Sequence, residues 1–214
     1  MDAAKRTRLS PDERRAQLID LGARMLAQRP LEQISVEDIA DQAGVSRGLL
    51  FHYFASKSEF HLAIVRHTSG QMLSRTEPPA SDNPMSDNPI TTLRSVLASY
   101  VDYVSENRNT YVSLLRGTAS GDPQMREVFE QTRDVMAART LEQLPKIGLT
   151  STPQVELAVR GWIAFVEEAT ISWLRAPAIT REELIELTVQ ALPALAGAAL
   201  GFTTVVDHLP LSAT

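Results

Sequence analysis

The sequence predicts an all-α protein of about nine helices, and three observations support this. Apolar residues recur about every three or four positions along most of the chain, the spacing of one helical face. Most of these segments begin at a Ser, Thr or Asp that can cap a helix. No segment shows the alternation of apolar and polar residues that indicates a half-buried strand. With 214 residues, of which 43% are hydrophobic, the chain can fold as one domain or two small ones.

Three helices are predicted in the first 57 residues. Ser10-Pro11-Asp12-Glu13 is a capping box with proline at the first helical position, and Arg29-Pro30 ends the helix that it opens. Ser35 caps a second helix, which Gly44 ends because glycine tolerates a tight turn. Residues 46–54 form a third, short helix that begins at a serine cap.

Residues 58–214 are predicted to form a larger helical domain. A helix capped at Ser56 reaches about residue 74. Residues 77–89 contain four prolines and are interpreted as a mobile loop that serves only as a spacer. Further helices begin near residues 93 and 111, at Asp122-Pro123, at Thr152-Pro153 and at the capping box 180–183.

The last apolar segment, residues 187–206, is uncharged and long enough to cross a bilayer. It is rich in Ala, Gly and Thr and contains Pro193, so its tendency to insert is weak. The start of the chain is polar and has no secretory signal. We therefore expect a cytoplasmic protein without membrane contact, and a membrane-associated interaction protein is the alternative.

The composition excludes several kinds of active site. The chain has no cysteine, which rules out disulfides, cysteine-ligated zinc and cysteine nucleophiles. It also lacks a P-loop and the GxGxxG, HExxH and GxSxG motifs, and its four histidines are not spaced to bind a metal together. We predict no catalytic residue, no metal site and no cofactor, and keep a helical enzyme as an alternative.

Residues 35–57 have the pattern of a helix-turn-helix, in which the second helix enters the DNA major groove. Leu50 and Phe54 form the apolar inner side of that helix, and its other side is available for double-stranded DNA. The candidate DNA-binding residues are Ser35, Ser46, Arg47, Gly48, Leu49, Phe51, His52, Tyr53 and Lys57.

Several of these residues have a clear physical role. Ser46 and the helix N-terminus can donate hydrogen bonds to a phosphate. Arg47 can reach a guanine or a phosphate, and Leu49 can contact a thymine methyl group. Tyr53 and Lys57 are suited to hold backbone phosphates.

The acidic composition first argues against a DNA partner, since the net charge is −5 and the pI is about 5.4. The two predicted domains differ, however. Residues 1–57 carry 9 basic and 8 acidic side chains, whereas residues 58–214 carry 12 and 18. Local placement of charge therefore governs DNA binding here, and the whole-chain average hides it.

The same stretch resembles the DNA-binding domain of the TetR family of transcriptional regulators. The matching residues are Ala43-Gly-Val-Ser46, Leu50-Phe-His-Tyr-Phe54 and Ser56-Lys57. Two residues depart from the family pattern: Phe51 stands where the family usually has a tyrosine that binds phosphate, and Leu49 stands where it often has a small or hydroxyl residue. The match covers about the first quarter of the chain.

The resemblance implies a DNA-binding domain over residues 1–57 and a ligand-binding and dimerisation domain over 58–214. It further implies a homodimer, most simply a repressor, that leaves a pseudo-palindromic operator when a small hydrophobic or amphipathic effector binds; an activator is the alternative. The candidate ligand-binding residues are Tyr103, Phe129, Met136, Trp162, Phe165 and Glu167. The candidate dimer-interface residues are Trp173, Leu192, Leu195, Gly197 and Gly201.

Overall fold

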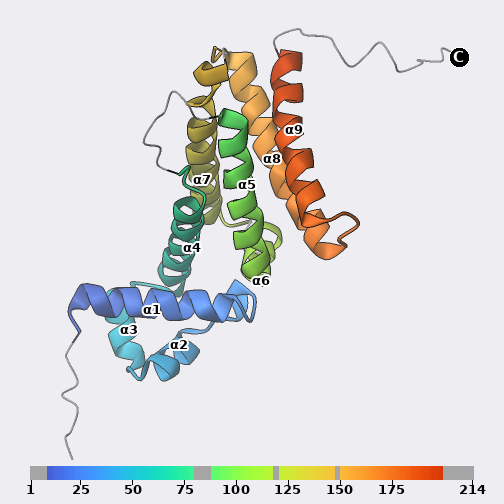
Figure 1. Cartoon of the computed structure of the whole chain (residues 1–214). Coiled ribbons are helices and arrows are strands. Elements are labelled where there is room, and N and C mark those ends of the chain that lie inside the picture. The colour runs from blue at the N-terminus through green and yellow to red at the C-terminus, as the bar shows by residue number, and fades with distance from the viewer. Residues whose placement is uncertain (1–8, 80–87, 118–120, 148–149, 200–214) are drawn as a thin grey trace, which may run out of the picture. The chain divides into compact units, whose positions relative to one another are not determined.

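The computed structural model describes residues 9–79, 88–117, 121–147 and 150–199. Within these ranges every regular element is a helix, as predicted (Figure 1). The chain divides into two compact units. The first unit comprises residues 1–72 and 106–130, and the second comprises residues 73–105 and 131–214.

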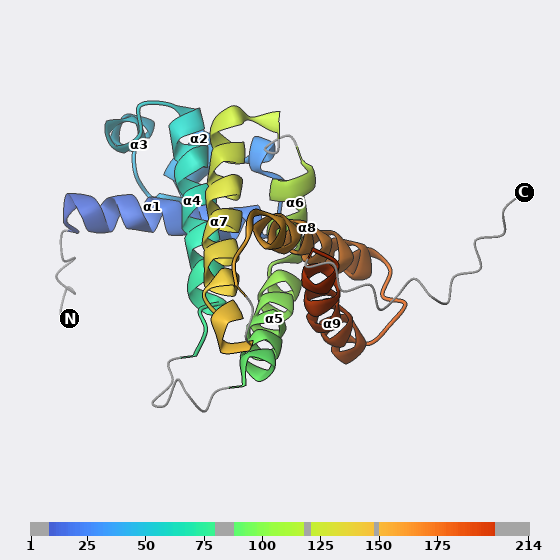
Figure 2. The same cartoon turned by 90° about the horizontal axis from the view of Figure 1, so that it is seen from above.

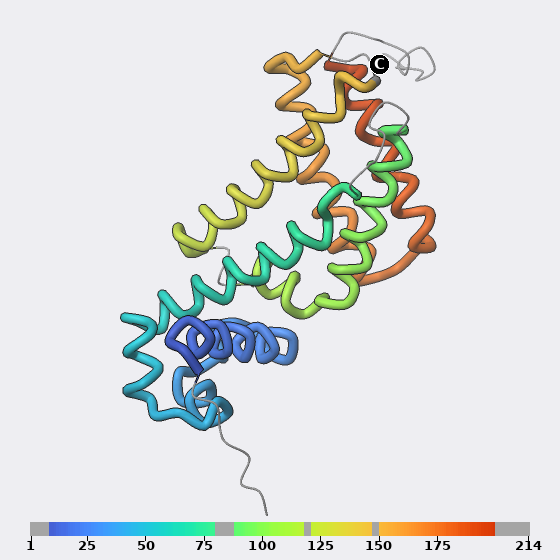
Figure 3. The backbone as a smooth tube through the Cα atoms, turned by 60° about the vertical axis from the view of Figure 1, so that its left-hand side comes forward, coloured from blue at the N-terminus to red at the C-terminus, as the bar shows by residue number. Residues whose placement is uncertain are grey.

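The first unit gathers α1, α2 and α3 at one end of α4 (Figure 3). Its core contains buried side chains from all four of these helices and from α6 and α7. Its elements are α1 (Pro11–Leu26), η1 (Leu31–Gln33), α2 (Val36–Ala43), α3 (Arg47–Tyr53), most of α4 (Lys57–Arg75), α6 (Arg108–Arg116) and the first turns of α7 (Pro123–Leu141).

This first unit is larger than the domain predicted to end at Lys57. Phe60 and Ile64 of α4 are fully buried against the core that also contains Phe54. Val128 and Phe129 of α7 join the same core. Three short helices alone would leave these apolar faces uncovered, so packing extends the unit beyond the helix-turn-helix.

The helix starts follow the predicted caps. Ser10 Oγ accepts a hydrogen bond from the Glu13 amide at 3.2 Å, and the Glu13 carboxylate accepts one from the Ser10 amide at 2.7 Å. The bond from the Ser10 amide holds the pKa of Glu13 below its usual value. Asp122 and Thr152 cap α7 and α8 (Pro153–Arg175) in the predicted way.

The second unit contains the rest of the chain that the structure describes. Helices α8 and α9 lie side by side in two perpendicular views (Figures 1 and 2). The predicted capping box opens α9, since Thr180 and Glu183 exchange hydrogen bonds of 2.8 and 3.2 Å. The elements are α5 (Pro89–Glu106), the rest of α7, η3 (Leu144–Ile147), α8 and α9 (Arg181–Ala199).

Two expectations fall partly outside the described residues. Of the predicted loop 77–89, residues 80–87 are not described, and α5 begins at Pro89. Of the apolar segment 187–206, the structure describes residues 187–199, which belong to α9. No helix in the described part of the chain is long and apolar enough to span a bilayer.

Gly22 lies at the close approach between α1 and α4. A Cβ atom at this position would lie 2.4 Å from Ile64 Cδ1 and 3.1 Å from Phe60 Cζ. Because both neighbours are fully buried, we expect Gly22→Ala to lower the free energy of unfolding by about 1–3 kcal/mol. Urea denaturation measures this loss.

Gly70, in the exposed part of α4, provides the matched control. No atom lies within 4 Å of a Cβ at this position. Gly70→Ala should therefore raise the free energy of unfolding by about 1 kcal/mol through helix propensity alone. Equal stability changes in the two variants would contradict the packing argument.

His61 is a buried titratable group in α4. Its Nε2 lies 3.1 Å from the Ile34 carbonyl oxygen, which can only accept, so Nε2 carries the proton. Burial lowers the pKa of His61 below its ordinary 6.5, Lys57 lowers the pKa further, and the Ile34 carbonyl and Glu32 oppose the shift. The folded protein therefore favours the neutral imidazole.

This depressed pKa predicts a loss of stability in mild acid. The unfolded chain binds a proton at His61 more readily than the folded chain, so the free energy of unfolding should fall as the pH drops below 6.5. Urea denaturation at about pH 7.5 and about pH 5.5 measures the difference. His61→Gln keeps a donor for the Ile34 carbonyl but cannot titrate. Its free energy of unfolding should therefore differ less between the two pH values than that of wild type.

Candidate DNA-binding surface and ligand pocket

The turn between α2 and α3 depends on Gly44. Its φ is +64°, the left-handed region that favours glycine, and it is the sole positive-φ residue in the part of the chain described. The Val45 amide donates to the Ala40 carbonyl at 2.9 Å, which closes α2. Ser46 then caps α3 by accepting a hydrogen bond from the Leu49 amide at 3.2 Å. The two helices are thus joined by a short, well-defined turn.

Helix α3 has a buried side and an exposed side. Leu50 is fully buried in the core, and Phe54, at the C-cap, is almost so. Leu49 and Phe51 are exposed although they are large and apolar. Such residues at a helix surface are suited to a partner, since water does not stabilise them there.

Arg47 is held by two groups while it remains exposed. Its guanidinium Nη1 lies 2.7 Å from Glu37 Oε1 on α2, and its Cζ lies 5.5 Å from the centre of the Phe51 ring. Exposed ion pairs contribute only about 0–1 kcal/mol, so a phosphate or a guanine can replace Glu37 at little cost. The two contacts restrict the conformations of Arg47 before DNA arrives.

The other predicted DNA-binding residues also lie on α2, α3 or the start of α4. Ser35 Oγ accepts from the Asp38 amide at 3.0 Å and caps α2. Tyr53 is half-buried and packs edge-on against His52. Lys57 Nζ donates to the Glu32 carbonyl at 3.4 Å. Contact of each residue with DNA stays a prediction.

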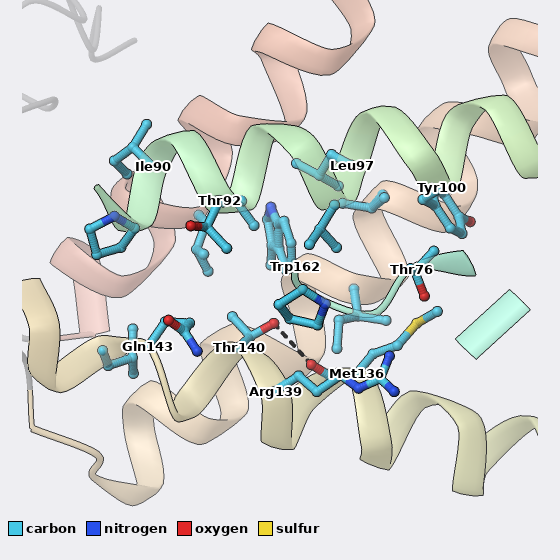
Figure 4. Close-up of a pocket in the computed structure, with 18 of the residues that line it drawn as sticks. Thr76, Ile90, Thr92, Leu97, Tyr100, Met136, Arg139, Thr140, Gln143 and Trp162 are labelled. Atoms are coloured by element: carbon cyan, nitrogen blue, oxygen red, sulfur yellow. Dashed lines mark hydrogen bonds between the residues drawn. The ribbon is translucent and has the colours of Figure 1, made fainter. Parts of the chain in front are cut away.

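The second unit contains a cavity of about 110 Å³. It lies among α5, α7, α8 and the segment that follows α4, and Trp162 lies near its middle (Figure 4). Met136, Trp162 and Glu167, three of the six predicted ligand-binding residues, line it. Its other lining residues include Leu97, Tyr100, Ile163, Val166 and Leu192.

The remaining three predicted ligand-binding residues do not line this cavity. Phe129 lies in the core of the first unit, because α7 contributes its first turns to that unit. Phe165 is exposed, since α8 turns Trp162, Ile163 and Val166 inward instead. Tyr103 is buried about one turn beyond Tyr100, where the cavity ends, and burial raises its pKa.

Most polar groups of the cavity wall already have partners. The Trp162 indole N–H donates to the Thr188 carbonyl at 2.8 Å. Glu167 accepts from Arg133 at 2.8–3.1 Å in a paired arrangement. Thr140 Oγ1 donates to the Met136 carbonyl at 2.9 Å, the dashed line in Figure 4.

An apolar surface remains exposed on α8 and α9. Leu157 is 72% exposed, Leu187 49% and Leu195 40%, and Phe165 adds to the apolar residues exposed on α8. Of these, the sequence predicted only Leu195 as a dimer-interface residue. Leu157 and Leu187 were not among the predicted residues, because their spacing alone does not say which helical face is covered by the same chain.

The other predicted dimer-interface residues have different surroundings, and their role at an interface stays a prediction. Leu192 is buried and lines the cavity, because it faces α8 rather than solvent. Trp173 is half-buried, and its indole N–H donates to the Ile179 carbonyl at 2.8 Å. Gly197 has open space where a Cβ would lie. Gly201 lies outside the described residues.

Two family models match the sequence. Residues 18–64 match "Bacterial regulatory proteins, tetR family", and residues 89–195 match "Tetracyclin repressor-like, C-terminal domain". The first match contains α2, α3 and the turn at Gly44, and the second contains most of the cavity wall.

Two curated relatives are similar to the chain. The transcriptional activator FasR of Mycolicibacterium smegmatis is 22% identical over 86% of this chain and 83% of its own length. The transcriptional repressor KstR2 of Mycobacterium tuberculosis is 50% identical over 48 residues, which are 22% of this chain and 24% of that protein.

Two solved structures are also similar. A tetR-family transcriptional regulator from Streptomyces coelicolor has 28% identity and a TM-score of 0.77, over 91% of this chain and 85% of its own. FadR from Bacillus subtilis, in complex with stearoyl-CoA, has 19% identity and a TM-score of 0.64, over 85% of this chain and 97% of its own. The latter likeness concerns the fold alone.

Proposed function

The chain belongs to the TetR family of DNA-binding transcriptional regulators, and from this premise we propose that it is a ligand-released repressor. A homodimer would bind a pseudo-palindromic operator through α3 and leave it when an apolar or amphipathic molecule enters the cavity. The main support for this proposal is the exposed side of α3, which offers Arg47, Leu49 and Phe51 to a DNA major groove.

The dimer is part of this proposal. The apolar residues that α8 and α9 expose need a partner to leave water, and a second copy can supply the same surface with two-fold symmetry. A two-fold dimer presents two α3 helices, and these match half-sites about 34 Å apart on one side of the duplex. Operator symmetry therefore follows from dimer symmetry.

The effector proposal rests on the cavity wall, which is mostly carbon. The stearoyl-CoA complex of the structural neighbour FadR supports an apolar effector class. An effector can release DNA only if it binds the released conformation more tightly than the DNA-bound one. Helix α4 contributes residues to both units, so the chain itself links the cavity wall near Thr76 to the unit that carries α3.

Mobility-shift titrations of the full chain test DNA binding, first on the DNA that flanks its own coding region and then on selected duplexes. We expect salt-sensitive, sequence-selective binding to a symmetric site. No selective binding to any duplex would overturn the proposal.

Transcription from the selected site in vitro separates the repressor from the activator. Added protein should lower transcription, and an effector should restore it. A rise on addition of protein would assign an activator instead.

A further inference from the structure

The cavity wall contains two charged side chains, Glu167 and Arg139. They differ in how they are paired. Glu167 is mostly buried and is neutralised by Arg133, whose Nε and Nη2 donate to both carboxylate oxygens. This acid is therefore not available to attract a cationic ligand.

Arg139 is paired differently. Its Nη1 donates to the Leu73 carbonyl at 2.8 Å, which satisfies one of the five N–H donors of a guanidinium. No carboxylate in the described part of the chain forms an ion pair with it. With Glu167 neutralised by Arg133, Arg139 is the one charge of the wall that no described side chain compensates.

The rest of the wall offers little to a polar ligand. The Trp162 N–H is bonded to Thr188, and the Thr140 hydroxyl is bonded to the Met136 carbonyl. In Figure 4 the Arg139 guanidinium lies at the end of the cavity near Thr76 and Met136, while Ile90 and Gln143 lie toward the other end. A bound molecule would therefore meet a cation at one end and mostly carbon beyond it.

We infer that the effector is an amphipathic anion, whose apolar chain fills the cavity while its carboxylate or phosphate pairs with Arg139. The claim that the bound anion acts as an effector rests on the proposed function. The claim that the anion binds in the cavity does not. An anion gains a charge-assisted, bidentate hydrogen bond in a mostly apolar surrounding. A neutral ligand leaves Arg139 unpaired, and a cationic ligand is repelled by it.

Calorimetric titration of the full chain tests this inference with ligands that share one chain and differ in the head group. Decanoate and decyl phosphate should bind, decanol should bind at least tenfold more weakly, and decyltrimethylammonium should not bind. Comparing the two anions shows which acid group Arg139 prefers. Octanoate and hexadecanoate cover shorter and longer chains.

Two variants locate the acid group. Arg139→Gln should weaken the carboxylates at least tenfold and leave decanol unchanged, and the unchanged decanol affinity shows that the cavity is intact. Arg139→Lys should restore part of the carboxylate affinity. Arg160→Gln is the matched control, because Arg160 is paired with Asp134 and does not line the cavity.

The outcomes separate this inference from the proposed function. Failure of all three carboxylates and of decyl phosphate to bind would overturn the inference, as would equal anion affinity in Arg139→Gln and wild type. If decanoate binds through Arg139 but does not release the protein from its operator in a mobility shift, the inference stands and ligand-released repression fails.

Discussion

Replacing Leu187 and Leu195 together with glutamate is expected to convert the proposed dimer into monomers. Both leucines are exposed on α9, two turns apart, at 49% and 40%. If a second copy covers this surface, burying the exposed part of each leucine contributes about 1 kcal/mol to association. The double variant loses this contribution and places carboxylates where no cation is expected, which adds a desolvation cost.

The same variant should lose specific DNA binding at protein concentrations where wild type is bound. A monomer presents one α3 helix and can contact only one half-site, whereas a dimer gains both contacts for one loss of translational freedom. Light scattering measures the mass of the particle, and a mobility shift on the symmetric site measures binding. The two losses should occur together.

Val135→Glu provides the matched control for this experiment. Val135 is also apolar and exposed in the second unit, but it lies on α7. Its replacement adds the same charge outside the α8 and α9 surface, so the dimer and the DNA complex should persist. A dimeric Leu187→Glu, Leu195→Glu variant would show that this surface is not the interface.

The sequence predicted the helices because the signals that start them are local. Ser10, Thr152 and the capping box at 180–183 bond within three residues of themselves, so short sequence windows contain the full information. The turn at Gly44 is local in the same sense. These parts of the fold do not depend on what packs against them.

The cavity was predicted only in part, because its wall depends on the rotation of each helix about its own axis. Helix α8 is apolar on more than one face, and the sequence does not say that Trp162 faces the cavity while Phe165 faces solvent. The neighbours of α8 decide this. For the same reason the sequence does not say that Leu192 on α9, predicted for the dimer interface, lines the cavity.

The ion pairs at both candidate sites could not be predicted from the sequence either. Arg133 and Glu167 are 34 residues apart, and nothing in either local pattern connects them. Glu37 and Arg47 lie on different helices, and only the turn at Gly44 brings them together. The extension of the first unit to residues 106–130 has the same non-local origin.

Arg47→Ala is expected to lower the affinity for the specific operator by about 1–3 kcal/mol, if Arg47 reads a guanine through its O6 and N7 atoms. The loss should then concentrate on the duplex that has the guanine, and duplexes altered at that base should bind both proteins equally. A loss of the same size on every duplex, with a smaller salt dependence, would identify a phosphate contact instead.

Two further variants distinguish the role of Arg47 from that of its neighbours. Arg47→Lys keeps the charge but cannot form the bidentate contact, so it should lose selectivity and retain most of the salt dependence. Arg24→Ala removes an exposed arginine from α1 in the same unit and should leave selectivity unchanged. Glu37→Gln releases Arg47 from its ion pair, so binding to unrelated DNA should rise more than binding to the operator. An equal rise on both duplexes would show that Glu37 acts through its charge alone rather than by orienting Arg47.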